Sequence, residues 1–573
     1  MSYFLKKTKK NKGLYLQIYR GDYDPRIKNT RQKCIQSLGY FDDLVASGIE
    51  DPLAHFQNEV DRLNEEERAK KDRNRDREVG AKAPYIHLGY FPIKCINDSL
   101  GVKRFMNLLQ EYAYPVKFNL YDLLSSLVYA RLVKPCSKRK TFYDVLPYLY
   151  ESQDISLDQL YRALDFFGTN YEKIIELYNA SILKKYPFET DHCYFDCTNF
   201  YFEIDHEDEL RRKGPSKENR FEPLIGMALL LDARQIPLGM KLYAGNESEY
   251  PYLESTVGEM KDRLGIEGRT IRVADKGLNS AKNLLQTVRS GDGYIFSKSV
   301  LKLPKTEQEW ILSKNDYTAI YDEKGQIEYW IKSCVDDFSY KVHEDDGSWN
   351  SFTLTEKRVV NFNPHLAKKK REEITKQVEK AKRLCRSQAQ RSEYGDSAKY
   401  VLFEAVDEDG VLSSDHVTLS LNWPLIEKHW KLAGYSLIVT SEIKLNERQI
   451  YLSYHGLWRI EESFRMMKSE LETRPIFLQT KERIFAHFLI CYLAVLFTRI
   501  FQIKILDDRH SYQKIIAFIR EFNVAKISEQ QFLSLRETDE FAREFQGDTG
   551  LPITHAYLNK SKVKKIMNYR FKN

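Results

Sequence analysis

Between residues 191 and 299, short apolar runs alternate with longer amphipathic segments. The short runs are bounded by turn residues and predict strands, whereas apolar positions spaced three and four apart predict helices. The predicted elements are strands at 193–204, 224–231 and 236–243, a helix at 252–264, a strand at 270–274, a helix at 280–289 and a strand at 294–297. This β-β-β-α-β-α-β order predicts an α/β domain in which helices pack on a mixed sheet.

The chain before this domain changes pattern twice. Residues 1–56 alternate apolar and polar positions around basic turns, which predicts a small β-rich module. Residues 57–84 are almost all charged and predict a linker or a solvated helix. Residues 85–190 then take up a helical pattern, in which Ser156 is placed to cap a helix.

The chain after residue 299 departs from the α/β pattern and later returns to it. Residues 300–435 predict a β-rich insertion, in which short strands precede a basic helix that begins at Pro364. A strand at 435–440 and a capping-box sequence that starts at Asn446 predict that residues 436–500 complete the α/β domain. Residues 501–573 predict a helical C-terminal region.

Composition narrows the class of protein. The 573 residues are 42% hydrophobic, which suffices for a globular protein of several domains. The net charge of +7 arises from 89 basic and 82 acidic side chains, so the surface permits a polyanionic partner. The eight cysteines are scattered without paired CxxC motifs, which predicts a reduced cytoplasmic protein with neither zinc fingers nor disulfides.

Two features of the sequence argue against a membrane location. The N-terminus lacks the hydrophobic core of a signal peptide. The longest apolar stretch, residues 484–497, is interrupted by His487 and is shorter than the roughly 20 residues that a membrane span requires. We therefore expect a buried helix there, and no membrane partner.

Two aspartates occupy positions at which an α/β sheet displays functional groups. Asp196 lies within the first predicted strand among apolar neighbours, so its carboxylate needs a partner. Asp275 ends the strand at 270–274, and open α/β sheets bind ligands at such strand ends. The two could share a metal ion. Taken singly, each has an ordinary role, Asp196 as a hydrogen-bonded strand residue and Asp275 as a helix cap.

A third carboxylate lies on the helix predicted around residue 460. Ile460 belongs to the core face of that helix, whereas Glu461, Arg465 and Lys468 line an adjacent face. Glu461 with Arg465 also fits an ordinary surface pair one helical turn apart. Three carboxylates that converge from strand, strand end and helix would bind two Mg²⁺ ions about 3.5–4 Å apart, as in enzymes of phosphoryl transfer.

The same helix carries a motif that resembles a family signature. Tyr454, Glu461 and Lys468 have the spacing of the Tyr-x2-Arg-x3-Glu-x6-Lys signature of the DDE transposases of bacterial insertion sequences. The local string YHGLWRIEESFRMMK resembles that family and puts Glu461, rather than Glu462, in register. Leu457 stands where the signature has Arg.

The resemblance covers residues 190–500 and has implications for the fold and the site. It includes Thr198, two residues after Asp196, and the Ala-Asp-Lys-Gly sequence around Asp275. It implies an RNase H-like catalytic domain, whose element order is the one that the apolar pattern predicts. It also implies Asp196, Asp275 and Glu461 as catalytic residues and as ligands of two Mg²⁺ or Mn²⁺ ions.

The resemblance implies DNA partners as well. These are the double-stranded transposon end and the target DNA, bound by a homodimer in a synaptic complex in the bacterial cytoplasm. Tyr454, Lys468 and Lys276 would contact DNA. Because Leu457 replaces the signature Arg, Arg459 and Arg465 become candidates for holding a phosphate.

Other segments are weaker candidates for contacts with DNA. The basic loop at 134–140 would make residues 85–190 a DNA-binding region, and the run at 368–371 would line a DNA channel. Solvated turns and amphipathic helices explain both equally well. A flipped base could stack on a tryptophan of the insertion, although core packing is an alternative for each. The candidates are Trp310, Trp330 and Trp349.

Three functions are therefore open. The first is a transposase that binds terminal inverted repeats, cuts them and joins them to target DNA by in-line phosphoryl transfer. The second is an RNase H-like nuclease that cuts DNA without joining it. The third is a DNA-binding descendant without catalysis, which the presence of all three acidic residues argues against.

Overall fold

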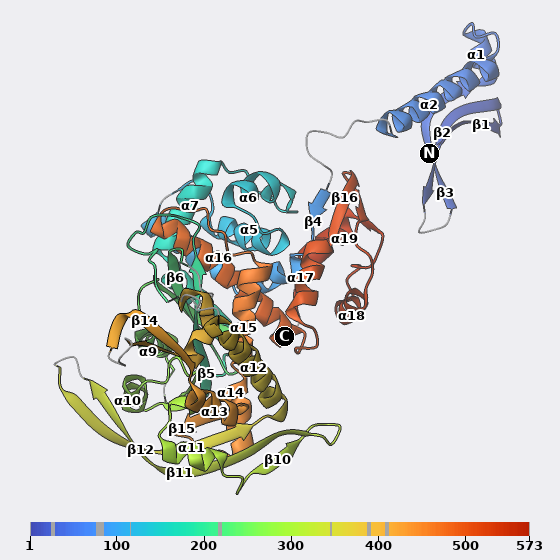
Figure 1. Cartoon of the computed structure of the whole chain (residues 1–573). Helices are drawn as coiled ribbons and strands as arrows, with labels where there is room; N and C mark the ends of the chain where they lie inside the picture. Colours follow the sequence, from blue (N-terminus) through green and yellow to red (C-terminus); the bar gives the residue numbers. More distant parts are fainter. Residues whose placement is uncertain are drawn as a thin grey trace. The chain divides into compact units, whose positions relative to one another are not determined.

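The computed structural model consists of two compact units, Met1–Pro84 and Tyr85–Asn573 (Figure 1). The structure describes residues 2–24, 29–75, 85–114, 116–215, 221–266, 268–343, 347–386, 391–406 and 412–571. Each unit has its own buried side chains, so each is described by itself.

The first unit is a three-stranded antiparallel sheet with two helices. Its elements are β1 (Ser2–Lys10), β2 (Gly13–Asp24), β3 (Asn29–Tyr40), α1 (Phe41–Ala46) and α2 (Pro52–Arg75). The predicted boundary at residue 56 is wrong, because α2 runs through it and packs against β1. Val60 of α2 is only 2% exposed. The charged helix therefore buries an apolar side chain against the sheet and belongs to the N-terminal module. Residues 76–84 of the predicted linker lie outside the described residues.

The second unit is built around a large mixed sheet, to which the described residues contribute nine strands. In spatial order these are β10 (Thr318–Tyr321), β11 (Ile327–His343), β12 (Trp349–Phe362), β15 (Tyr435–Thr440), β9 (Gly293–Lys298), β8 (Ile271–Ala274), β5 (His192–Tyr201), β6 (Leu224–Leu231) and β7 (Pro237–Ala244). Strands β5, β8 and β9 are parallel, whereas β6 and β7 run antiparallel to their neighbours. Every residue of β6 is buried, as expected for a strand covered on both faces.

The predicted order of elements between residues 191 and 299 is confirmed. Helix α9 (Tyr250–Leu264) separates β7 from β8, and α10 (Ala281–Arg289) separates β8 from β9. Ser280 caps α10 through its side chain, and Asn446 forms the predicted capping box of α14 (Glu447–His455). Local apolar periodicity and cap residues thus sufficed to define this part of the fold.

We expected the segment 300–435 to form a separate β-rich domain, and this expectation is wrong. Strands β10 to β12 join the main sheet, because β12 pairs antiparallel with β15 over six residues from Lys357↔Thr440 to Phe362↔Tyr435. The predicted basic helix is present as α12 (Pro364–Arg386). The other elements of the segment are α11 (Lys305–Leu312), β13 (Val401–Val406), β14 (Leu412–Leu421) and α13 (Trp423–Lys431). Backbone pairing between distant segments leaves no local signal in the sequence, so the extension of the sheet was not predictable.

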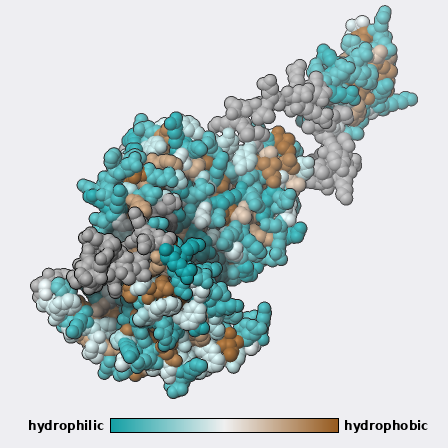
Figure 2. All heavy atoms as spheres, viewed as in Figure 1, coloured by the Kyte–Doolittle hydropathy of each residue, from teal (hydrophilic) through white to brown (hydrophobic). Residues whose placement is uncertain are grey.

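Helices surround a long buried helix in the rest of the unit. The buried helix is α16 (Lys481–Ile500), and the helices around it are α3 (Phe91–Ser99), α4 (Val102–Ala113), α5 (Leu120–Val133), α6 (Lys138–Asp144), α7 (Leu157–Thr169) and α8 (Tyr171–Lys185). Length and hydropathy alone would let α16 cross a membrane, but 94% of its most apolar window is buried. The face shown in Figure 2 is mostly hydrophilic, with apolar side chains in small patches. As predicted, α16 is the core helix of this unit.

The C-terminal region is only partly helical, which corrects our prediction. Helices α17 (Tyr512–Glu521), α18 (Glu540–Thr549) and α19 (Lys560–Met567) alternate with short strands. The strands β16 (Asn523–Ser528), β17 (Gln531–Ser534) and β18 (Tyr557–Asn559) form a sheet with β4 (Tyr85–His87). The two ends of the unit are therefore tied together by β4, which pairs with β16.

Candidate active site

Asp196 and Asp275 lie side by side on neighbouring parallel strands. Phe195 of β5 is in register with Ala274 of β8, and each is followed directly by one of the aspartates. Residues in register on adjacent strands direct their side chains to the same face of the sheet. The two carboxylates thus share one face, and the fully buried Phe195 points to the other. Both aspartates are half-buried.

Two hydroxyl groups hold the carboxylate of Asp275. Ser297 Oγ of β9 donates to Asp275 Oδ1 at 2.9 Å, and the Tyr454 hydroxyl of α14 donates to the same oxygen at 3.1 Å. Burial, aided by the negative charges of Asp275 and Glu461, raises the pKa of Tyr454 far above its ordinary value. Tyr454 therefore remains a hydrogen-bond donor. The sequence did not point to Ser297, because its role depends on β9 lying next to β8.

The helix that carries Glu461 runs along the same face of β5. Gly456 and Leu457 keep right-handed helical dihedrals, so α14 continues through α15 (Trp458–Arg465) into a π-helical turn, η4 (Met466–Glu470). A Cβ on Gly456 would lie 2.2 Å from the Tyr194 hydroxyl, so only glycine allows this approach. Further along, Lys468 Nζ lies 5.4 Å from the ring centroid of Phe200. Tyr194 and Phe200 flank Asp196 on its own face of β5.

The contact of Gly456 with Tyr194 and that of Lys468 with Phe200 are separated by similar distances along the helix and along β5. Gly456 to Lys468 spans roughly 18 Å of helix, and Tyr194 to Phe200 spans roughly 20 Å of strand. Glu461 lies roughly 7.5 Å along the helix and Asp196 roughly 6.6 Å along the strand from the first contact. We infer that Glu461 and Asp196 lie at the same level of the site. Glu461 also acts electrostatically on Tyr454, which touches Asp275.

Glu461 and its neighbour Glu462 differ in their surroundings. Glu461 is exposed, and none of the described residues forms a salt bridge or a side-chain hydrogen bond with it. Glu462 accepts from Arg499 at 2.8 Å and from Arg459 at 3.0 Å. Arg499 is fully buried on α16, so this pair ties α15 to the core helix. Of the two, Glu461 is the one that the described residues leave open to solvent.

Leu457 and the two arginines proposed to replace the signature Arg have different surroundings. Leu457, which replaces the signature Arg, is 8% exposed and packs in the core. Arg459 stacks on Trp458 at 4.0 Å and is paired with Glu462 and Asp508, so it already has carboxylate partners. Arg465 is exposed and acts on Tyr512 of α17, on the side of Glu462. Of these three residues, only Arg465 offers a charge to solvent.

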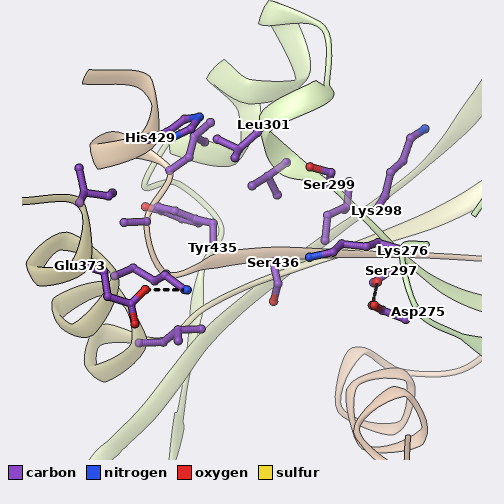
Figure 3. Close-up of a pocket in the computed structure, with 18 of the residues that line it drawn as sticks. Asp275, Lys276, Ser297, Lys298, Ser299, Leu301, Glu373, His429, Tyr435 and Ser436 are labelled. Carbon is purple, nitrogen blue, oxygen red and sulfur yellow. Dashed lines mark hydrogen bonds and ion pairs between the residues drawn. The ribbon is translucent and has the colours of Figure 1, made fainter. Parts of the chain in front are cut away.

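A cleft of about 450 Å³ opens beside Asp275 (Figure 3). Lys276 extends into it from the end of β8, and α12 of the inserted segment forms the opposite wall. On that wall Lys370 pairs with Glu373 at 2.9 Å. Lys368 and Arg371 of the same basic run line a second hollow, next to Trp430. The insertion therefore borders the candidate site, although the charges of α12 are divided between two surfaces.

The basic side chains of the loop at 134–140 are also divided, between solvent and the protein interior. Arg139 and Lys140 are exposed, whereas Lys138 is 5% exposed and donates to His487 Nδ1 of α16 at 3.1 Å. Burial, with the nearby charge of Arg131, holds the pKa of Lys138 well below its ordinary value. A cavity of about 580 Å³ adjoins this pair. Lys138 is thus a buried residue rather than part of a solvated basic turn.

The three candidate tryptophans differ in exposure. Trp349 is 70% exposed near the end of the β11–β12 hairpin, whereas Trp310 and Trp330 are half-buried. Lys332 lies over the Trp310 ring at 4.9 Å, and Trp330 pairs with Phe362 within the sheet. Trp349 is therefore the one of the three whose ring is largely open to a partner.

The acidic residues fit divalent metal ions by their chemistry. Carboxylate oxygens are the ligands that Mg²⁺ prefers, and Asp196 and Asp275 supply them from adjacent strands. Among the described residues, no group of three His, Cys, Asp or Glu side chains is close enough to hold one ion. A two-ion arrangement requires only that pairs of carboxylates share each ion.

Comparison with known proteins identifies a family. Residues 196–497 match the model of the family described as "Transposase DDE domain", which is just over half of the chain and begins at Asp196 itself. Among solved structures, the chain resembles the cryo-EM structure of a piggyBac transposase synaptic complex with hairpin DNA. That match has a TM-score of 0.36 and 10% identity, and it covers 77% of this chain and 80% of that one. No curated protein matches the sequence. On the family match, the chain belongs to the transposases with a DDE domain.

Proposed function

We propose that the chain is the DNA transposase of a bacterial insertion sequence. It binds the terminal inverted repeats of its element as a homodimer in the cytoplasm, cuts the ends and joins them to target DNA. The observation that carries the proposal is the pair of aspartates on β5 and β8, with the helix of Glu461 running along β5. Membership of the transposase family supplies the reaction class.

The catalytic domain of this proposal is RNase H-like. The strand order β7-β6-β5-β8-β9 puts the first strand of the domain at its centre. Of the other four strands, β6 runs antiparallel to β5, whereas β7, β8 and β9 run parallel to it. A carboxylate on the central strand meets a second one at the end of the next parallel strand. Strand ends of this kind are where open α/β sheets bind ligands.

Asp196, Asp275 and Glu461 would hold two Mg²⁺ or Mn²⁺ ions. Such ions, when bound, activate a water or a 3′-hydroxyl and stabilise the leaving oxygen of an in-line displacement. Ser297 and Tyr454 direct one oxygen of Asp275, which leaves its other oxygen for a ligand. Glu461 is exposed, so its carboxylate can reach a ligand without breaking an ion pair of the described residues.

The cations around the carboxylates suit the phosphates of a DNA end. Lys276 lies next to Asp275 in the cleft, and Lys468 lies over Phe200 on the strand of Asp196. Each would neutralise a phosphate and add to the salt dependence of binding. Arg465 is a further DNA contact in this proposal. Arg459 is better suited to holding α15 in place, because it is engaged by Glu462 and Asp508.

The experiment follows cleavage and joining of a labelled duplex that carries the terminal repeats flanking the chain's own coding sequence. The wild-type chain is compared with Asp196→Asn, and with Asp205→Asn as a matched control on an exposed residue just beyond β5. Reactions run in Mg²⁺ and in EDTA. We expect cut and joined products from the wild type and the control in Mg²⁺, and none from Asp196→Asn or in EDTA.

The other outcomes separate the alternatives. Cutting without joined products would identify a nuclease, and binding without cutting would identify an inactive descendant. Products that persist in EDTA or with Asp196→Asn would reject the assigned site. Gel filtration of the DNA complex tests the dimer in the same preparation.

A further inference from the structure

A strong concentration of positive charge lies outside the family-matched region, in the first unit. Residues 1–41 hold ten lysines and arginines but two aspartates, so their net charge of +8 exceeds the +7 of the whole chain. Helix α2, by contrast, balances six acidic residues with six basic ones. The positive charge therefore belongs to the segment 1–41 and not to the helix α2.

One face of the β1–β2 ribbon is the packed face. Leu16 and Ile18 of β2 are fully buried, and their partners in register on β1 are Lys7 and Leu5. Asn64 of α2 makes two hydrogen bonds with the backbone of β1, at 2.8 and 3.0 Å. This side carries the small core of the unit at Leu16 and Ile18. The alternation of a strand puts Lys7 and Lys9 on the same side, where both side chains are exposed beyond the core.

The opposite face carries basic and aromatic side chains. Lys6 Nζ lies 4.4 Å from the ring centroid of Tyr19, and Lys10 Nζ lies 3.7 Å from that of Tyr15. Such contacts pack the stems of the lysines on the rings and keep the ammonium groups at the surface. Asp42 borders this face at the β1–β2 turn. Asp22 and Asp24 end β2. Residues 2–21, over which β1 and β2 pair, contain no acidic residue, so this paired part of the ribbon offers positive charge.

We propose that this face of the β1–β2 ribbon is a second DNA-binding surface, which contacts the phosphate backbone of duplex DNA. The choice of DNA rests on the proposed transposase function, and the charge of the ribbon is complementary to a polyanion. Duplex is favoured over single strands, because lysines cover the Tyr15 and Tyr19 rings that unpaired bases would need for stacking.

The test measures binding of the full chain to a labelled duplex of unrelated sequence, in EDTA and over a range of salt concentrations. Lys6→Gln/Lys10→Gln removes two charges from the proposed surface, and Lys7→Gln/Lys9→Gln removes two exposed charges from the other side of the same strand. We expect the first pair to weaken binding roughly tenfold or more and to lower the salt slope by about 2. The second pair should change both quantities much less. Lys6→Arg/Lys10→Arg should retain the wild-type affinity.

Equal losses from the two pairs would overturn the proposal, as would tighter binding of single-stranded DNA or duplex RNA than of duplex DNA. Melting curves of both double variants show whether the sheet stays folded. Because EDTA prevents metal-dependent cutting, this result is independent of the catalytic test. A wild-type chain that binds through Lys6 and Lys10 but never cuts would reject the transposase function and keep the surface. A Lys6→Gln/Lys10→Gln chain that binds DNA as tightly as the wild type, from a protein that cuts normally, would reject the surface and keep the transposase function.

Discussion

Glu461 and Glu462 are adjacent on α15, yet their carboxylates lie in opposite surroundings. Glu462 is held by Arg459 and by the fully buried Arg499, whereas Glu461 faces solvent with no ion pair among the described residues. A carboxylate with saturated partners contributes to the position of its helix. A carboxylate without them is free to bind a ligand. The comparison teaches that partners, rather than residue type, separate the two roles.

The largest expected effect is on catalysis and comes from Glu461→Gln. This change removes a metal-binding charge while it keeps the shape of the side chain, so we expect cleavage to slow by roughly three orders of magnitude or more. Stability should change by less than about 0.5 kcal/mol, because the side chain is exposed. Single-turnover cleavage and thermal melting measure the two effects. A Glu461→Gln chain that cuts normally would reverse the assignment.

Glu462→Gln should have the opposite profile. The change leaves the buried Arg499 without its carboxylate partner. Removing one partner of a buried ion pair lowers the free energy of unfolding by about 3 kcal/mol. We expect a lower melting temperature of the second unit, with catalysis retained in part below that temperature. Replacing both partners, as in Glu462→Gln/Arg499→Met, should recover some of the loss. If Glu462→Gln abolished cleavage without destabilising the chain, the comparison would fail.

The next prediction concerns the hydroxyl groups of Ser297 and Tyr454, which donate to Asp275. Tyr454→Phe and Ser297→Ala each remove one hydrogen bond to Asp275 Oδ1, worth about 1 kcal/mol, so each should slow cleavage by several-fold to tenfold. The double variant should lose less than the sum of the two, because both donors serve one oxygen. The measurement is the rate at saturating Mg²⁺, together with the Mg²⁺ concentration that gives half of that rate. Strict additivity would show that the two donors act separately.

The smallest expected effect concerns DNA affinity. Lys468→Met should lower the salt slope of transposon-end binding by about 1, since one phosphate contact is lost. Lys565→Met, a change at an exposed lysine of α19, is the matched control and should leave the slope unchanged. Binding titrations at several salt concentrations distinguish them. Equal slopes for the two variants would remove Lys468 from the DNA contacts.

The candidate site was predictable from sequence where its residues carry a local pattern. Asp196 and Asp275 follow apolar strands, and Glu461 was fixed by the spacing from Tyr454 to Lys468. The hydrogen bonds of Ser297 and Tyr454 to Asp275 join three separate elements, so no local pattern contains them. The same holds for Lys138, which the sequence presents as part of a basic loop and the fold buries against His487.

The sequence by itself determined the order of elements from β5 to β9, the cap of α14 and the buried helix α16, because periodicity and capping act over a few neighbouring residues. Only the tertiary structure decided that β12 extends the main sheet, that β4 pairs with β16, and that Gly456 meets Tyr194. Those contacts join residues far apart along the chain. Their free energy depends on which surfaces meet, and a pattern confined to one segment cannot encode it.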